Sequence, residues 1–208
     1  MKKTFFIIYI YIFIIFLTAC ENDNTNDIKE NTYYNYTATK TIANEENNNV
    51  ETSISIPETD LSSFSTKIYT PNDSARQNNI TLTCAKLNGT IVKKGETFSF
   101  CNTVGKATPE AGYQKADIFD KDGNKIKGYG GGNCQISSTL YNSILEIPSL
   151  TVIERHEHSN EVYYVPLGKD AAVAYGSIDF KFRNDSNYDI KIYCSNTTNT
   201  VDVKIVKL

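Results

Sequence analysis

A run of three glycines followed by an amphipathic segment constrains the fold of this chain more than any other feature. Residues 130–141 read GGGNCQISSTLY, and Ile136, Leu140 and Ile144 recur every four residues through and beyond this run. Glycine permits a tight turn, and apolar residues at this spacing form one face of a helix. We therefore expect a helix over residues 134–146 that ends before a proline and packs its apolar face on another element.

Cys134 opens the predicted helix, where unpaired N–H groups and the positive end of the helix dipole favour a thiolate over a thiol. Gly131 and Gly132 would let a substrate approach the backbone closely. His156 and His158 are the only histidines in the chain. A cysteine and a histidine far apart in sequence can meet in a fold as nucleophile and base, which makes Cys134 a candidate nucleophile. The alternative is a buried structural thiol, the common state of free cysteine.

The N-terminus has the pattern of an export signal. Lys2 and Lys3 precede an apolar run over residues 5–17, which is shorter than the roughly 20 residues that a membrane-spanning helix needs. The run closes with LTAC, which resembles a bacterial lipobox. We expect residues 1–19 to be a lipoprotein signal peptide and Cys20 to become the lipidated first residue, anchored in the outer face of the bacterial cell membrane. The alternative is an uncleaved N-terminal anchor, and both place the rest of the chain outside the cytoplasm.

An asparagine-rich, acidic segment follows this signal. Nine asparagines lie between residues 21 and 50, without sustained apolar periodicity. Such a composition is typical of a disordered tether, so we expect residues 20–56 to be the lipidated cysteine and its tether, and residues 57–208 to be a single folded domain. The formal net charge of −3 and the lack of a basic run give no reason to expect a nucleic-acid partner.

Apolar spacing and turn residues predict an α+β fold, in which the cysteine-led helix packs on a mainly antiparallel sheet. Ile80, Cys84 and Leu87 share one helical face before an Asn-Gly stop, although the ITLT sequence in this segment also allows a strand. We expect a helix over residues 74–87 and strands over residues 90–92, 97–100, 116–119, 150–155, 161–165, 171–183, 188–194 and 200–206.

The strand over residues 171–183 decides which acid would accompany His158. Apolar and polar residues alternate toward its end, and Asp179 falls on the polar face. If residues 166–169 form the turn of an uninterrupted hairpin, antiparallel pairing places Asp179 opposite His158. A carboxylate there would orient the imidazole and stabilise its protonated form. Asp170 lies near the turn and becomes the candidate if the hairpin is bent.

Ordered motifs along the domain resemble the VanW domain. They cover most of residues 60–195, so the resemblance rests on many patterns in one order. They are LNG at 87–89, GETFSF at 95–100, GY at 112–113, GGGNCQ at 130–135, SSTLY at 137–141, Arg155 with His158-Ser159, YVPLG at 164–168, Asp170-Ala171 and DFKF at 179–182. The family takes its name from an accessory protein of vancomycin-resistance clusters, and that name says little about chemistry.

The resemblance implies a reaction, because some members of this family are cysteine-dependent L,D-transpeptidases that form 3-3 cross-links in peptidoglycan. Cys134 thiolate would then attack a carbonyl of a peptidoglycan stem peptide, His158 would move protons, and terminal D-alanine would leave without any cofactor. The N–H groups of Cys134 and Gln135, with a side-chain amide, would stabilise the oxyanion. Water in place of the acceptor amine would give a carboxypeptidase. The alternative is a non-catalytic peptidoglycan-binding module in which Cys134 merely packs.

Three further substrate-binding candidates each have a second interpretation. Ser137 would touch the substrate, or cap and pack the helix. Arg155 would bind a substrate carboxylate, or pair with Glu154 or Glu157 on an exposed strand. His156 shares its strand parity with His158, and would otherwise be a surface residue.

Two other cysteine arrangements remain open at this point. A zinc site of Cys134, His156 and His158 would have three ligands and no evident fourth, so we expect no metal. A disulfide between Cys84 and Cys101 is compatible with an exported domain but is not required by the sequence.

Overall fold

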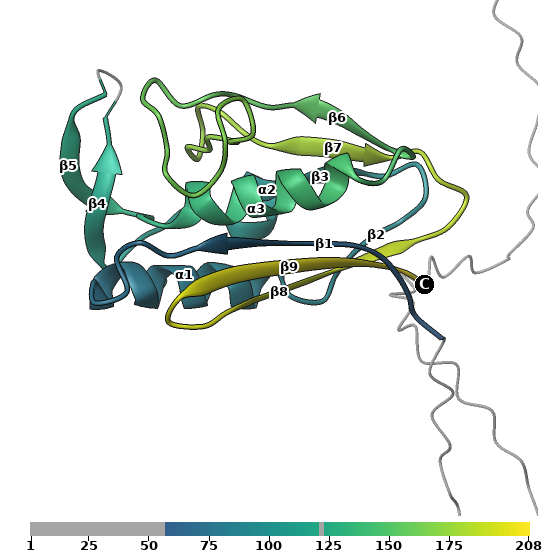
Figure 1. Cartoon of the computed structure of the whole chain (residues 1–208), viewed down its shortest axis with the longest axis horizontal. Helices are drawn as coiled ribbons and strands as arrows, with labels where there is room; N and C mark the ends of the chain where they lie inside the picture. The colour runs from purple at the N-terminus through teal and green to yellow at the C-terminus, as the bar shows by residue number, and fades with distance from the viewer. Residues whose placement is uncertain (1–56, 121–122) are drawn as a thin grey trace, which may run out of the picture. The chain divides into compact units, whose positions relative to one another are not determined.

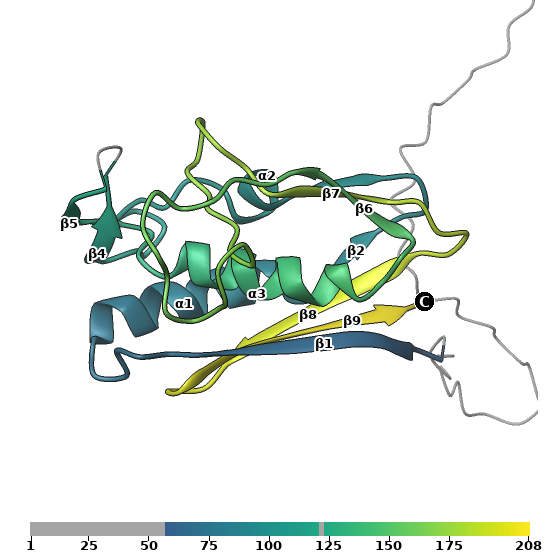
Figure 2. The ribbon, with the colours of Figure 1, turned by 45° about the horizontal axis from the view of Figure 1, so that its top comes forward.

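The helix that carries the cysteine lies between two antiparallel sheets (Figures 1 and 2). The computed structural model describes residues 57–120 and 123–208. The predicted signal peptide, the lipidated Cys20 and the tether up to residue 56 lie outside the described residues. The helix in question is α3, Asn133–Leu145.

The larger sheet has four antiparallel strands in the order β1-β9-β8-β2, and the smaller has three in the order β3-β7-β6. A separate two-stranded hairpin joins β4 to β5. The strands are β1 Thr59–Lys67, β2 Thr90–Val92, β3 Thr97–Ser99, β4 Lys115–Phe119, β5 Lys125–Tyr129, β6 Leu150–Glu154, β7 Lys181–Asn184, β8 Ile190–Asn196 and β9 Thr200–Lys207. The other helices are α1 Ser74–Leu87 and α2 Phe100–Val104. The predicted α+β class with antiparallel sheets is confirmed.

Helix α1 forms where the sequence predicts it because the sequence carries a capping residue before its first turn and a glycine after its last. The carboxylate of Asp73 accepts the backbone N–H of Arg76 at 2.9 Å and so caps the first turn. At the other end Gly89 takes a φ of +85°, a conformation that favours glycine. Ile80 and Leu87 are completely buried, so the apolar face points into the core and the strand alternative is wrong.

Helix α3 is buried on nearly every side, which explains its unusual composition. Ile136, Leu140 and Ile144 are fully buried in the core, as their spacing predicts. Small polar residues cover the remaining surface, and nine of its 13 residues are buried. Toward the smaller sheet, the ring of Tyr141 meets the ring of Phe180 edge to face, with centroids 5.6 Å apart. The helix therefore shares one core with both sheets.

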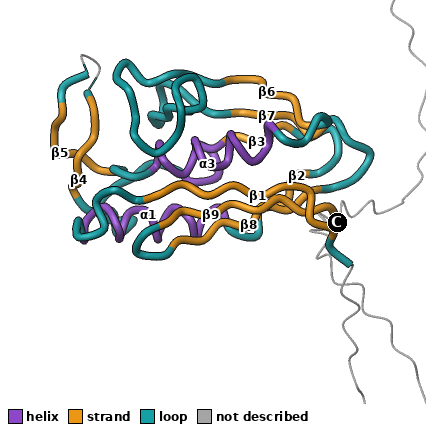
Figure 3. Tube along the Cα trace, viewed as in Figure 1, coloured by secondary structure: helices purple, strands orange, loops and turns teal. Residues whose placement is uncertain are grey.

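The segment between β6 and β7 is where the predicted topology is wrong. The strand predicted over residues 161–165 is absent. Of the strand predicted over residues 171–183, only the last three residues lie in a strand, at the start of β7, and residues 155–180 form an irregular loop (Figure 3). β6 pairs directly with β7, with Val152 opposite Phe182 and Glu154 opposite Lys181. The alternating residues before β7 thus leave the sheet, and the hairpin predicted around residues 166–169 does not form. We call residues 155–180 the β6–β7 loop.

None of the helices in residues 57–120 and 123–208 is long and apolar enough to span a membrane.

Candidate active site

Cys134 is the second residue of α3 and follows a glycine turn that only glycine can fill. Gly132 has a φ of +116°, in the left-handed region that L side chains avoid. A Cβ on Gly132 would lie 2.7 Å from Cγ1 of Ile80, and one on Gly131 would lie 2.8 Å from Cβ of Ala116. The two glycines, predicted as substrate-binding, are therefore explained by the close packing of this turn against α1 and β4.

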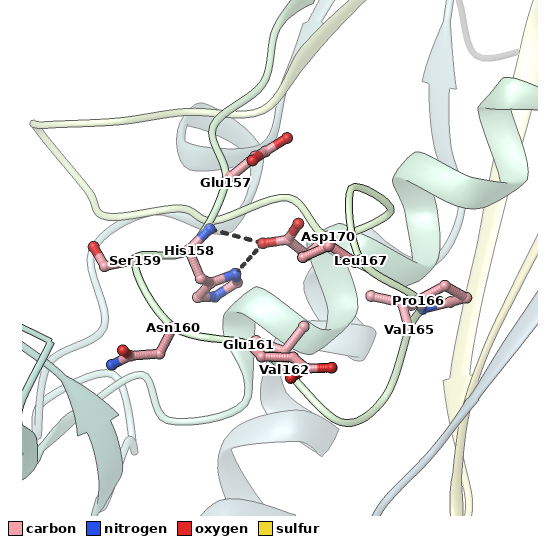
Figure 4. Close-up of a pocket in the computed structure, with 10 residues that line it drawn as sticks. All are labelled: Glu157, His158, Ser159, Asn160, Glu161, Val162, Val165, Pro166, Leu167 and Asp170. Atoms are coloured by element: carbon pink, nitrogen blue, oxygen red, sulfur yellow. Dashed lines mark hydrogen bonds and ion pairs between the residues drawn. The ribbon is translucent and has the colours of Figure 1, made fainter.

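His158 and Asp170 form a buried pair on the β6–β7 loop (Figure 4). His158 Nδ1 lies 2.6 Å from Asp170 Oδ2, and the backbone N–H of His158 donates to the same oxygen at 2.7 Å. The two side chains are only 11% and 9% exposed. One carboxylate oxygen thus fixes both the backbone and the ring of the histidine, and it does so through Nδ1.

The Cys134 thiol completes this arrangement. Burial of the ring opposes protonation of His158, but hydrogen bonding and charge interactions with Cys134 and Asp170 raise its pKa above the ordinary value. The Cys134 sulfur also lies 3.5 Å from the carbonyl oxygen of Val173. Burial likewise opposes ionisation of Asp170, yet the bonds from His158 lower its pKa. The fold thus brings together a thiol, an imidazole and a carboxylate in the order typical of cysteine nucleophiles.

Arg155 at the start of this loop and two serines of α3 hold the loop in place. Arg155 donates from Nε to the carbonyl oxygen of Asp170 at 2.6 Å and from Nη2 to its carboxylate at 2.8 Å. Ser138 Oγ accepts the N–H of Ala171 at 2.8 Å, and Ser137 Oγ donates to the carbonyl oxygen of Ala171 at 2.5 Å. Asp170 is therefore fixed by contacts that come from far along the chain.

Asp179 does not accompany His158, and that prediction is wrong. Its carboxylate accepts the hydroxyl of Ser99 at 2.6 Å and the N–H of Cys101 at 2.9 Å, at the start of α2. The physical reason is the direct pairing of β6 with β7, which removes the extended hairpin on which the predicted register depends. Asp170, the candidate for a bent loop, lies beside His158 instead.

The other substrate-binding candidates are engaged in contacts within the protein. Ser137 is fully buried and binds the loop as described above. Arg155 binds Asp170 and also pairs with Glu157 at 2.7 Å, so its guanidinium is occupied. Nε2 of His156 lies 3.0 Å from Oε1 of Glu154, in a pair separate from that of His158.

Gln135 is buried and does not face a substrate, with only 2% of its surface exposed. Its side-chain amide donates to Thr66 Oγ1 at 3.0 Å and to the carbonyl oxygen of Lys67 at 3.1 Å. Its backbone N–H donates to the carbonyl oxygen of Gly132 at 3.0 Å. Of the predicted oxyanion donors, the backbone N–H of Cys134 itself is thus better placed, because N–H groups in the first turn of a helix have no intrahelical acceptor.

A small pocket of about 110 Å³ lies beside the histidine (Figure 4). The β6–β7 loop forms its walls, with Glu157, His158, Ser159, Asn160, Glu161, Val162, Val165, Pro166, Leu167 and Asp170 around it. Tyr163 and Leu167 on this loop are 83% and 86% exposed. The loop therefore provides a recess and apolar surface next to the candidate catalytic groups.

Two further residues, Tyr164 and Arg76, are not identified as site residues from the sequence. Burial raises the pKa of Tyr164, and the Cys134 charge adds to this effect. Arg76 donates from Nη2 to Oε1 of Gln135 at 2.9 Å. The only sequence signal for Arg76 is a cation in the first turn of a helix, where an acid is expected.

The remaining described cysteines are free and buried. The disulfide considered between Cys84 and Cys101 is not formed, since both thiols are free, and the Cys84 thiol interacts with that of Cys194. Burial and the neighbouring Asp179 raise the pKa of Cys101 to about 12. Within residues 57–120 and 123–208, no cluster of three or more His, Cys, Asp or Glu side chains is arranged to hold a metal ion.

Comparison with known proteins gives a consistent result over this part of the chain. Residues 75–206 match the family described as "VanW like protein". The chain is 40% identical over 124 residues to "Uncharacterized protein YoaR" of Bacillus subtilis, covering 60% of this chain and 40% of the relative. It is 36% identical over 120 residues to "Vancomycin B-type resistance protein VanW" of Enterococcus faecalis, covering 55% of this chain and 43% of the relative. The chain thus spans about two fifths of the length of these curated relatives. No solved structure matches it.

Proposed function

This chain belongs to the VanW-like protein family, and from that premise we propose that it is a cysteine acyltransferase of the cell envelope. The reaction that we propose is L,D-transpeptidation, in which peptidoglycan stem peptides are joined by 3-3 cross-links. The observation that carries this proposal is the position of the Cys134 thiol, which contacts the β6–β7 loop at the carbonyl oxygen of Val173, where that loop also holds the buried His158–Asp170 pair. A thiol that merely packs needs no histidine oriented by a carboxylate beside it.

In the first half of the reaction, His158 Nε2 takes the thiol proton and Cys134 sulfur attacks the carbonyl carbon of the third stem residue. Asp170 keeps the ring oriented through Nδ1 and stabilises the imidazolium that forms. The N–H of Cys134 at the start of α3 stabilises the developing oxyanion.

The tetrahedral intermediate then collapses to a thioester. The carbon–nitrogen bond to terminal D-alanine breaks, and His158 returns its proton to the departing amine. An amine from a neighbouring stem attacks the thioester carbon, gives up a proton to His158 and releases the thiolate as the cross-link forms. Water in place of the amine would release a shortened stem and make the enzyme a carboxypeptidase.

The location that we propose follows the export signal of the sequence. A lipidated Cys20 would hold the protein on the outer face of the cell membrane, where stem peptides are found. Resistance to vancomycin is stated in the name of the Enterococcus relative and forms no part of the proposal.

The test is to incubate the purified protein with a disaccharide-tetrapeptide and to analyse the products by mass spectrometry. Cys134→Ala and His156→Ala serve as the inactive and the matched control variants. We expect a cross-linked dimer lacking one terminal D-alanine with the wild type and His156→Ala, and none with Cys134→Ala.

Two other results would change the assignment. Loss of D-alanine without a dimer would identify a carboxypeptidase that uses the same thioester. No product from a folded protein with a reduced thiol would contradict catalysis and favour a peptidoglycan-binding module, in which the recess beside His158 holds the ligand.

A further inference from the structure

Arg76 places a guanidinium beside the nucleophile helix without an acidic partner. It lies in the first turn of α1 and is half-buried. Its Nη2 donates to Oε1 of Gln135 at 2.9 Å, and Gln135 directly follows Cys134 in α3. Among residues 57–120 and 123–208, no Asp or Glu forms an ion pair with this guanidinium. A half-buried arginine bound only to a neutral amide retains most of its capacity to bind an anion.

The position of this guanidinium is fixed by the buried amide that it contacts. Gln135 uses its nitrogen to donate to Thr66 and Lys67 on β1, so its oxygen must face Arg76. The backbone of Arg76 also lies close to the glycine turn, since a Cβ on Gly132 would be 3.7 Å from the carbonyl oxygen of Arg76. Arg76 is therefore held against the turn that presents Cys134.

The charges around Arg76 favour an anion at this point. The guanidinium adds a full positive charge to the N-terminal ends of both α1 and α3, each of which carries a partial positive charge. Asp73 is the nearest acid in sequence, but its carboxylate caps the backbone N–H of Arg76 and makes no ion pair with the side chain. Asp170, the acid of the candidate site, is already bound to Arg155 and His158.

We propose that Arg76 is the specificity-determining residue that binds the terminal carboxylate of the donor stem peptide. The inference rests on the proposed function, because it takes Cys134 as the nucleophile. In a tetrapeptide donor, the carboxylate of the leaving residue is separated from the attacked carbonyl only by an amide nitrogen and an α-carbon. It is thus the substrate anion nearest to the thiol. A donor extended by one residue presents a neutral amide at this position, so Arg76 would select donors that end in a free acid there.

The test compares two donors that differ only at their C-terminus, a tetrapeptide stem with a free carboxylate and the same stem with a C-terminal amide. Acylation of Cys134 is followed by intact-protein mass spectrometry. The wild type should acylate on the acid donor with a higher kcat/KM, by on the order of 30-fold for one charge-assisted contact. Arg76→Gln should lose this preference. Its rate of acylation by the acid donor should fall below that of the wild type, while its rate with the amide donor should stay nearly the same.

Two variants control for charge and for folding. Arg183→Gln removes an exposed arginine of β7 that pairs with Asp185, and should keep the full preference. Arg76→Lys keeps the charge but loses the planar fork, and should retain part of the preference. Circular dichroism and thermal unfolding check that each variant is folded.

Three outcomes would overturn the inference. An unchanged preference in Arg76→Gln, or equal rates of the wild type on both donors, would show that Arg76 does not bind the carboxylate. An equal loss on both donors would show a structural role. In each case, persistent acylation of Cys134 would leave the proposed function standing, whereas no Cys134-dependent adduct with either donor would overturn both.

Discussion

The helix and the loop that meet at the candidate site are held in place by different kinds of interaction. Helix α3 is positioned by apolar burial, with Ile136, Leu140 and Ile144 completely buried at regular spacing. The β6–β7 loop has little regular structure. Within it, Arg155 holds Asp170, and a serine of α3 holds the neighbouring Ala171. The nucleophile thus depends on the core, whereas its base depends on a small set of polar contacts. Changes to the two regions should therefore separate stability from activity.

Removal of the loop histidine should have the largest effect on activity. His158→Ala deletes the base and should reduce acylation of Cys134 by about 1,000-fold. It also leaves Asp170 without its buried partner, but the apolar core around α3 is unchanged, so the protein should stay folded. His156→Ala removes a histidine two residues away that pairs with Glu154, and should leave the rate within a few-fold of wild type. The measurement is the single-turnover acylation rate with the tetrapeptide donor. Similar losses in both variants would contradict the assignment of His158.

Removal of a core side chain from the helix should give the opposite pattern. Leu140→Ala should lower the free energy of unfolding by about 2 to 5 kcal/mol, because Leu140 is fully buried. Leu145→Ala, in the same helix, should cost much less, because Leu145 is 42% exposed. Urea unfolding checks both values. Under conditions where each variant stays folded, both should acylate at nearly the wild-type rate, and a selective loss of activity in Leu140→Ala would break the comparison.

Removal of Arg155, which holds Asp170 in the β6–β7 loop, should have an intermediate effect on activity. Arg155→Gln removes the cation that binds both the carbonyl and the carboxylate of Asp170, and should slow acylation by about 10- to 100-fold. Glu157→Gln breaks the more exposed pair on the other side of Arg155 and should change the rate less than about threefold. The readout is again the acylation rate, together with thermal unfolding. A large fall in melting temperature for Arg155→Gln would mean that the contacts of Arg155 stabilise the whole fold and not only the β6–β7 loop.

The smallest expected effect is a shift of the His158 titration. Burial lowers the pKa of His158, but interactions with Cys134 and Asp170 outweigh it and raise the pKa above 6.5. A histidine whose pKa is higher in the folded protein than in the unfolded chain stabilises the fold when it is protonated. This stabilisation is complete at pH values below the pKa of the unfolded chain, and it is lost as the pH rises through the pKa of the folded protein. Asp170→Asn should lower the His158 pKa, seen by NMR titration of the imidazole, and should reduce this loss of stability with rising pH. An unchanged titration would show that Asp170 does not hold the charged ring.

Helix α3 is held by apolar burial and the β6–β7 loop by polar contacts, and this difference also explains which parts of the structure can be predicted from sequence. The helix over residues 74–87 is confirmed, and α3 begins at Asn133, one residue before the predicted start. The spacing of apolar residues predicts which face of an element is buried, and both helices bury such a face in the core. Most strands of the larger sheet are predicted within a few residues for the same reason.

The β6–β7 loop could not be predicted because its conformation depends on contacts that periodicity does not report. Ile178, Phe180 and Phe182 alternate like a strand, yet only the last of them lies in β7. The choice of Asp170 over Asp179 is decided by Arg155 and the helix serines, which are distant in sequence. Arg76 is likewise placed by a buried Gln135, whose orientation depends on β1.

The most direct test of the central claim, that the loop pair activates the helix thiol, is the alkylation rate of Cys134 by iodoacetamide at neutral pH. Peptide mapping isolates Cys134 from buried Cys84 and Cys194, which serve as unreactive controls in the folded protein. We predict that wild-type Cys134 reacts about tenfold or more faster than in His158→Ala, with Asp170→Asn in between. Equal rates in the three folded proteins would contradict the account, because the histidine and carboxylate would then have no influence on the thiol.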